Sequence, residues 1–354
     1  MNIYIMNGTS GISDIVDNFQ SVIWNMQYYG RGDLDLVVTA TEKNLNTLKE
    51  GVFLVREEDI GENRFDNVMR IEGIHLSFNV EEGWIMTVTG KSLKNILSQR
   101  IVWSQTNLSG SVEKGIRQVL TENVISPADS SRAIPNFILD TEQGFTDTFD
   151  VQLLGENIAE WLEETCKSYG MGWDVYIKNG KLVFALTKGA DRTDDQDVNI
   201  PVVFSPEYDN LVTSDYSYDL GEFKNAALIG GEGEGTNQKT ASVGTASGLS
   251  RYEAFVDGSS VSSNGEIITP EQYQVLLENY GQEQIDQTYT VEKTEGTVIP
   301  NGMYNLNEDY FLGDLVQIKN GFIEAKTRVI EIIYSEDENG WALTPTFSSW
   351  EGDD

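Results

Sequence analysis

The chain has 354 residues, and its 57 acidic against 24 basic side chains give a net charge of −33 at pH 7. Such a surface repels phosphate, so the charge argues against a nucleic-acid binder of the usual kind and against binding to an anionic membrane. The 39% hydrophobic and 10% aromatic content nevertheless supplies enough apolar area for a folded core. The length predicts two or three domains.

Cysteine and histidine are almost absent from the sequence, since Cys166 and His75 are the only ones. An intrachain disulfide is therefore impossible, and zinc would lack its usual nitrogen and sulfur ligands. A catalytic triad of the Ser-His-Asp type would have to use His75. We see no signal peptide after Met1 and no apolar run as long as a membrane-spanning helix requires. We therefore expect a soluble protein with little catalytic equipment, no cofactor and no membrane insertion.

Residues 1–103 are expected to form antiparallel strands with one short helix. The strands are predicted at 22–29, 34–38, 52–55, 68–71, 74–80 and 84–88, and the helix near 93–97. These runs are short, β-branched and aromatic, and turn residues such as Gly30 separate them. Within 74–80 the apolar residues alternate, so they share one face of the strand. Several short strands joined by turns indicate a β-barrel or a sandwich.

Residues 104–190 change to helical spacing and then return to strands. Helices are predicted at 112–119 and 156–169, followed by a hairpin of strands 173–177 and 182–186. Ser109 or Ser111 is available as the N-cap of the first helix, and Gly170 suits the end of the second. Asn179 and Gly180 at the hairpin tip are the strongest short-range turn signal, because both residues tolerate positive φ. This part is predicted to be a small α+β domain.

The polar run 191–197 marks the expected start of a third part, 191–354. Strands are predicted at 202–204, 226–229, 252–256, near Tyr289, and at 315–318, 329–333 and 341–343. The stretch 232–248, rich in glycine, serine and threonine, is expected to be a mobile loop. Thr269, Pro270 and Gln272 predict the capping box of a helix at about 270–287. The sequence thus predicts a mainly β protein with an α+β insert, divided into 1–103, 104–190 and 191–354.

Two motifs invite a ligand interpretation, and each has a simpler one. In 230–235 glutamates alternate with glycines and no helix signal follows, so a loop after a strand is favoured over a phosphate cradle. Asp195, Asp197 and Asn199 resemble the start of a calcium loop. However, Ile200 and Pro206 stand where that loop requires glycine and glutamate. An EF-hand is therefore excluded, whereas another calcium site among the many carboxylates stays open.

Single reactive residues give no stronger signal. His75 is expected at an exposed or interface position of its strand, and Cys166 in the apolar stripe of its helix. The Arg-Gly-Asp tripeptide 31–33 is expected at a hairpin tip, where the conformational freedom of glycine explains it. Carboxylate pairs for sugar hydrolysis cannot be chosen by counting, since every region is acidic. We therefore assign no catalytic, cofactor or metal residue.

Six stretches in the middle and last parts form an ordered set. They are 161–163 (WLE), 204–211 (FSPEYDNL), 225–235 (NAALIGGEGEG), 251–257 (RYEAFVD), 310–316 (YFLGDLV) and 345–347 (PTF). Together they resemble the tail-hub, or baseplate hub, proteins of siphophages and prophages of Gram-positive bacteria. One departure is the pair Gln238-Lys239, where a basic residue would be expected sooner after the glycine run.

The resemblance implies a structural virion protein and not an enzyme, related in fold to contractile-tail baseplate hubs and type VI spike bases. It implies two antiparallel β-barrel domains flanking the α+β domain. It further implies a homotrimeric ring that adapts a sixfold tail to a threefold tip and lines part of the DNA channel. The implied partners are the distal tail ring protein, the tape-measure protein and receptor-binding or fibre proteins. The implied location is the distal tail tip of a virion that is assembled in the host cytoplasm.

Two other classes of protein stay open from the residues alone. A cell-wall carbohydrate-binding or carbohydrate-degrading protein would show an aromatic groove with two facing carboxylates. A shell or surface-layer β-protein would assemble into extended sheets rather than closed trimers.

Overall fold

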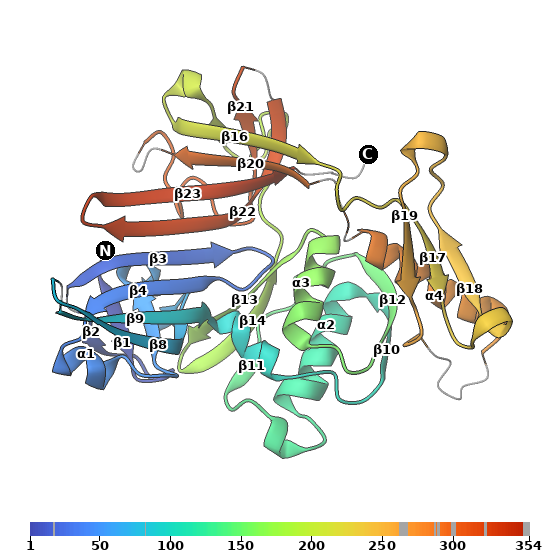
Figure 1. The fold of residues 1–354 in the computed structure, drawn as a ribbon, viewed down its shortest axis with the longest axis horizontal. Coiled ribbons are helices and arrows are strands. Elements are labelled where there is room, and N and C mark those ends of the chain that lie inside the picture. The colour runs from blue at the N-terminus through green and yellow to red at the C-terminus, as the bar shows by residue number, and fades with distance from the viewer. Residues whose placement is uncertain are drawn as a thin grey trace.

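The computed structural model describes residues 1–16, 18–81, 83–261, 268–286, 288, 291–298, 302–321 and 324–349. Within these ranges the protein is mainly β, as predicted, with a few helices (Figure 1). No helix in the described part is long and apolar enough to cross a membrane.

The helices and strands follow one another in this order. The first part contains β1 (Ile3–Met6), β2 (Ile12–Ile15), β3 (Phe19–Gln27), β4 (Asp33–Thr39), α1 (Glu42–Thr47), β5 (Phe53–Arg56), β6 (Ile60–Gly61), β7 (Arg64–Phe65), β8 (Met69–Asn79) and β9 (Gly83–Ser92). The middle contains the 3₁₀ helix η2 (Leu93–Gln99), β10 (Thr106–Ser111), α2 (Val112–Leu120), β11 (Phe137–Leu139), β12 (Thr148–Leu153), α3 (Ile158–Ser168), β13 (Gly172–Lys178) and β14 (Lys181–Thr187). The last part contains β15 (Val203–Phe204), β16 (Leu211–Asp219), β17 (Ala226–Gly230), β18 (Thr240–Val243), β19 (Glu253–Asp257), α4 (Pro270–Asp286), β20 (Val291–Val298), β21 (Leu315–Lys319), β22 (Glu324–Asp337) and β23 (Gly340–Ser349).

One large sheet joins the two ends of the chain. Its strands pair in the order β16-β20-β23-β22-β3-β4-β9-β8-β5-β1-β2, with β21 on β22 and β15 on β21. Strand β22 from the last part pairs antiparallel with β3 from the first, so that Tyr334 lies opposite Trp24. Among the described strands, β16 and β2 lie at opposite edges of this sheet and do not pair with each other, so the sheet does not close into a barrel. The boundaries at 103 and 190 stay a prediction, but the hydrogen-bonded sheet runs across both β-rich parts.

Three groups of buried apolar side chains form the cores. The first lies under the large sheet and includes Trp24 and Phe347, which come from opposite ends of the chain. The second fills the middle part, where α2 and α3 pack with the hairpin β13–β14 (Figure 1). The third is small and lies between α4 and the sheet β18-β17-β19. Because the cores are separate, the contacts between them determine how the three parts are held together.

Local sequence signals predicted local structure well. The hairpin β13–β14 turns at Asn179 and Gly180, both with positive φ. Helix α2 begins at Ser111, whose hydroxyl accepts a hydrogen bond from the Lys114 amide. Before α4, Thr269 and Gln272 bond reciprocally, as a capping box requires. Helix α4 ends at Asp286. The strand expected near Tyr289 falls on a residue outside the described ranges, and β20 begins shortly after that residue, at Val291.

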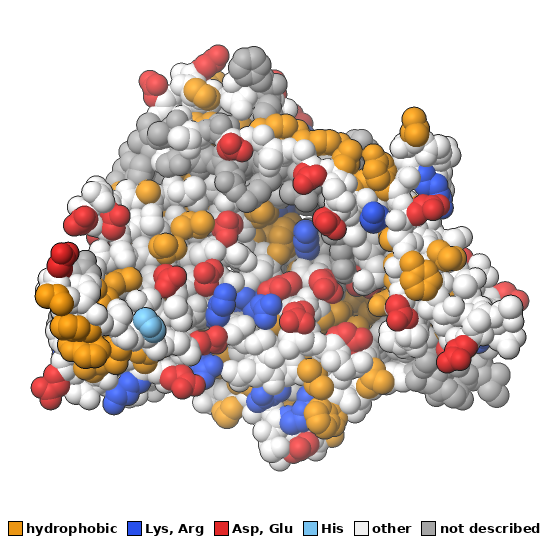
Figure 2. Space-filling model, viewed as in Figure 1, with side chains coloured by type: hydrophobic (Ala, Val, Ile, Leu, Met, Phe, Trp, Pro, Cys, Tyr) orange, Lys and Arg blue, Asp and Glu red, His pale blue; other side chains and the backbone are white. Residues whose placement is uncertain are grey.

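One expectation differs from the structure, and one exposed surface was not predicted. The stretch 232–248, predicted to be a loop, contains the strand β18, which pairs with β17. The strand is held by backbone hydrogen bonds and buries one side chain, Ala241, so it carries little apolar signal in the sequence. The apolar face of β8 is exposed, since Ile74, Leu76 and Phe78 show 42%, 45% and 58% of their surface to solvent. The reason is that β5 pairs with β8 only near Met69, so the rest of the β8–β9 hairpin projects from the sheet. Hydrophobic side chains gather at this end of the molecule (Figure 2).

Candidate functional site: the junction behind strand β3

The segment that follows β3, residues 27–32, contacts the middle and last parts of the chain. We call these residues, together with Lys94, Trp173 and Gly313, the central junction. Strand β3 is hydrogen-bonded between β22 and β4, so the position at which it ends is fixed by the large sheet. The hydrogen bonds and packing of the junction then determine how the middle part is held against that sheet.

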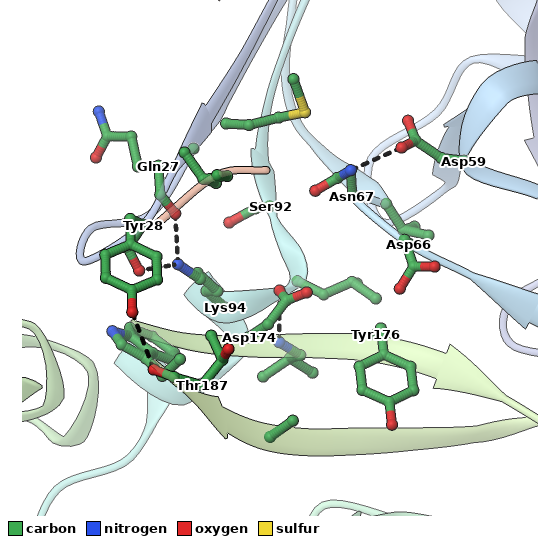
Figure 3. A pocket seen from close by; sticks show the side chains of 18 of the residues that line it. Gln27, Tyr28, Asp59, Asp66, Asn67, Ser92, Lys94, Asp174, Tyr176 and Thr187 are labelled. Atoms are coloured by element: carbon green, nitrogen blue, oxygen red, sulfur yellow. Dashed lines mark hydrogen bonds between the residues drawn. The ribbon is translucent and has the colours of Figure 1, made fainter. Parts of the chain in front are cut away.

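Lys94 crosslinks the backbone of the junction. Its ammonium donates to the carbonyl oxygens of Gln27 and Tyr28 at 2.6 and 3.1 Å (Figure 3). It donates as well to the carbonyl oxygen of Gly30 at 2.9 Å. It also lies 4.9 Å from the centre of the Trp173 ring. Burial lowers the pKa of Lys94 to about 8, and the carboxylate of Asp174 opposes that shift. The ammonium is therefore largely charged at neutral pH with all three donors in use, which suits a structural crosslink and not a nucleophile.

Tyr28 is held between two glycines from distant parts of the chain. A Cβ atom on Gly172 of β13 would lie 2.0 Å from the Tyr28 ring, and one on Gly313 would lie 2.2 Å from it. Gly313 also has φ +97°, a conformation that favours glycine. The Tyr28 hydroxyl donates to the Thr187 carbonyl at 3.0 Å and accepts from the Gly189 amide at 3.2 Å. One buried ring thus contacts both the middle and the last parts.

Two further bonds attach the middle part to this segment. The indole N–H of Trp173 donates to the Tyr29 carbonyl at 2.6 Å. Arg31 binds Glu163 of α3, also at 2.6 Å. Arg31 belongs to the Arg-Gly-Asp tripeptide, which is therefore part of an internal contact and not a free loop tip. Gly32 is required for space, because a Cβ there would lie 2.1 Å from the Asn25 carbonyl oxygen.

A cavity of about 500 Å³ lies beside Lys94 (Figure 3). Its charged lining comprises Glu58, Asp59, Arg64, Asp66, Lys94 and Asp174. Arg64 binds Asp66 at 2.8 Å and covers the Tyr176 ring at 3.9 Å from its centre. Burial raises the pKa of Asp66 and of Asp174, and the cations Arg64 and Lys94 respectively counteract this. The four lining carboxylates outnumber the two lining cations, but Arg56, outside the lining, binds Glu58 at 3.0 Å and Asp59 at 2.6 Å. This arrangement indicates a polar joint between the sheet and the hairpin β13–β14.

The reactive residues singled out from the sequence lie away from this cavity. His75 is exposed on β8, as predicted. Cys166 is fully buried in α3, as predicted, and burial raises the pKa of its thiol to about 12. Neither residue lines the cavity with Lys94 and Asp174.

The two motifs for which the sequence disfavoured a ligand interpretation are used in internal contacts. After β17, Glu232 binds Lys239 at 3.3 Å and donates its amide to the Tyr273 hydroxyl, so the run 230–235 is folded against α4. Asp195 pairs with Lys326 across the last part of the chain. Among the described residues, no group of three or more His, Cys, Asp and Glu side chains is arranged to hold a metal ion. Sequence reasoning missed the central junction, for which the one signal was a lysine within the short predicted helix 93–97.

Three solved structures of tail proteins are similar to this chain in fold. The chain is similar to the 43 kDa tail protein of prophage MuSo2 from Shewanella oneidensis, with 15% identity, a TM-score of 0.58 and 98% of each chain covered. It is similar to a tail protein from Neisseria meningitidis, with 13% identity, a TM-score of 0.59 and coverage of 99% and 97%. It is also similar to prophage tail protein gp18 from Listeria monocytogenes, with 11% identity, a TM-score of 0.54 and coverage of 100% and 96%. The fold is therefore that of prophage tail proteins over nearly the whole chain.

The family follows from the sequence profile of the Siphovirus ReqiPepy6 Gp37-like proteins, which matches residues 2–347. The chain belongs to this family. The resemblance to siphophage and prophage tail proteins, stated from six short stretches, is thus confirmed. Curated protein sequences gave no match.

Proposed function

We propose that this chain is a structural protein of a siphovirus or prophage tail and forms the central hub at the distal end of that tail. The family match over residues 2–347 carries the proposal. Full-length similarity in fold to three tail proteins, two of them from prophages, supports it. The central junction is consistent with an architectural role, because its buried lysine and tyrosine connect parts of the chain.

The proposed hub is a homotrimer in which the β-rich parts of three copies form a ring. Within the described residues the large sheet ends at β16 on one side and at β2 on the other. Sheet edges carry unpaired backbone groups that proteins normally cover or pair. Neighbouring subunits, the distal tail ring protein, the tape-measure protein and fibre or receptor-binding proteins are the proposed partners. Pairing between copies would complete the two expected barrels.

The charge fits a channel through which DNA passes. A net charge of −33 makes the chain strongly repulsive to phosphate at low and moderate salt. Acidic side chains are spread over the visible face and exceed the basic ones there (Figure 2). We propose that such a surface lines part of the DNA channel and keeps the genome from adhering to it.

Immunogold labelling tests the location directly. Antibody raised against this chain should place gold at the distal tip of intact tailed particles. The assembled protein, released gently from those particles, should show a mass of three times 39.5 kDa by native mass spectrometry. Gold along the tail shaft or on the capsid would refute the hub, and label confined to cell walls would favour the carbohydrate-binding alternative.

A further inference from the structure

The cavity beside Lys94 lies where three parts of the chain meet. Met26 and Ser92 of the first part line it, together with Asp174 of β13 and Leu312 of the last part. Its volume of about 500 Å³ is within the range that small ligands occupy in proteins. A ligand in this cavity would contact all three parts at once, so its binding would stabilise their arrangement.

Two side chains of the lining have hydrogen-bonding capacity that the protein does not use. The hydroxyl oxygen of Ser92 is buried and has no hydrogen-bond partner among the described atoms. Asp174 accepts one hydrogen bond, at 2.8 Å from the amide of Val175, and it makes no ion pair within the described part of the chain. Polar groups enclosed by protein are normally satisfied by another protein group, by water or by a ligand. Figure 3 shows the oxygens of Ser92 and Asp174 around the same space.

Asn67 supplies a third oxygen, which a buried ion pair orients. The side-chain N–H of Asn67 donates to Oδ1 of Asp59 at 2.6 Å, and Arg56 donates to Oδ2 of the same carboxylate at 2.6 Å. Arg56 and Asp59 are only 1% and 5% exposed, so their positions are fixed by packing. A carboxylate only accepts, so the amide nitrogen of Asn67 must face it. The amide oxygen consequently points away from Asp59 and into the cavity (Figure 3).

The charges around the cavity leave one negative charge uncompensated. Its lining carries four carboxylates, of which Arg56 pairs with two and Arg64 with a third. The fourth belongs to Asp174. The three N–H groups of Lys94 are directed at backbone carbonyl oxygens, so Lys94 acts on Asp174 through its charge alone. Three of these four carboxylates thus have a cation bound to them, and the carboxylate of Asp174 still accepts a donor.

We propose that this cavity binds a small organic ammonium, namely a primary amine with a short apolar body. Its three N–H groups match the oxygens of Ser92, Asn67 and Asp174, and its charge complements the carboxylate. The apolar body would lie against side chains of the lining such as Met26 and Leu312.

Other ligand classes fit the lining less well. An anion would meet four carboxylates. A directly bound metal ion lacks its ligands, since no set of three His, Cys, Asp or Glu side chains in the described ranges is arranged to hold one. The amine site is separate from the proposed role in a tail and does not depend on it.

Isothermal titration calorimetry of the full chain with n-butylammonium chloride tests the site. About 0.15 M NaCl screens weak attraction of the amine to the acidic surface. We expect one amine per chain, and 1-butanol, which has the same body without the charge, should bind at least about tenfold more weakly. The amine should also raise the melting temperature above that in an equal concentration of NaCl, because it binds the folded state. No binding, or binding of many ammonium ions per chain, would overturn the proposal.

The variant Ser92→Ala separates binding from stability. Because its hydroxyl has no partner among the described atoms, its removal should leave the melting temperature of the free protein unchanged. It should weaken amine binding about 3- to 10-fold, which corresponds to one hydrogen bond. An affinity in Ser92→Ala equal to that of the wild type would show that the amine does not bind at this hydroxyl and would refute the site.

A pair of charge variants tests whether the amine only follows the net charge of the chain. Asp174→Asn should weaken binding about 10- to 100-fold, because it removes the charged acceptor. The matched control Asp150→Asn changes the net charge equally at an exposed position of β12 and should bind the amine like the wild type. An equal loss of affinity in both variants would mean that the amine associates with the acidic surface in general, which would contradict the proposal.

Discussion

Replacing Tyr28 by phenylalanine removes one oxygen atom from the middle of the central junction and keeps the ring between Gly172 and Gly313. Two backbone groups then lose a partner, namely the Thr187 carbonyl and the Gly189 amide, and both of these bonds are only partly buried. A buried hydrogen-bonding group left without a partner costs about 1–3 kcal/mol. Because both groups belong to the short segment that leaves β14 and can partly rearrange, we expect a total loss of about 2 kcal/mol in the free energy of unfolding.

Urea unfolding followed by circular dichroism measures the loss in the free energy of unfolding. Hydrogen–deuterium exchange shows which part of the chain is destabilised. The peptide that contains Gly189 should exchange faster in Tyr28→Phe, while peptides from α4 should not change. Tyr218→Phe is the matched control, since Tyr218 is 57% exposed and its variant should lie within about 0.5 kcal/mol of the wild type. If Tyr28→Phe matched this control in both measurements, the hydroxyl would not connect the parts of the chain as we argue.

Three other substitutions test the junction and α4. Lys94→Met leaves three carbonyls and Asp174 without their cation, so we expect a loss of about 3 kcal/mol in urea unfolding. Gly172→Ala forces a methyl group against the Tyr28 ring and should cost about 1–3 kcal/mol. The control Gly61→Ala should be nearly neutral, because its Cβ would meet only ordinary contacts at 3.6 Å. Thr269→Ala removes the N-cap of α4, which we expect to cost about 1 kcal/mol and to speed amide exchange in the first turn of α4 alone.

The parts of the fold that the sequence predicted are those decided by neighbouring residues. The turn at Asn179 and Gly180 and the capping box of Thr269 and Gln272 each depend on residues within a few positions of one another. The buried position of Cys166 also followed from helical spacing alone. Such signals are short-range and survive in almost any tertiary context, so element types could be predicted without knowing how the elements meet.

The central junction could not be predicted, because its contacts join residues far apart in the chain. Nothing in the local sequence of Tyr28 shows that Gly172 and Gly313 will approach its ring, since each glycine has an ordinary local interpretation. The pairing of β22 with β3 has the same character. For β8, alternation correctly placed Ile74 and Phe78 on one face, but whether that face is covered depends on how far β5 extends beside it.

The strong negative charge of the chain acts differently on its two internal contacts, and salt can distinguish them. At the junction, buried Lys94 supplies a positive charge and its bonds are short, so added salt should change little. Where α4 contacts β12, the charges that raise the pKa of Glu283 are the carboxylates of Glu164, Asp286 and Glu156, so screening should relieve repulsion and tighten this contact. We therefore expect that raising NaCl from about 0.05 to 0.5 M at pH 8 slows exchange in 276–286, because the screening length falls to a few ångströms. Exchange in the peptide with Gly189 should not change. Faster exchange in 276–286 at high salt would mean that attraction, not packing against repulsion, holds α4 in place.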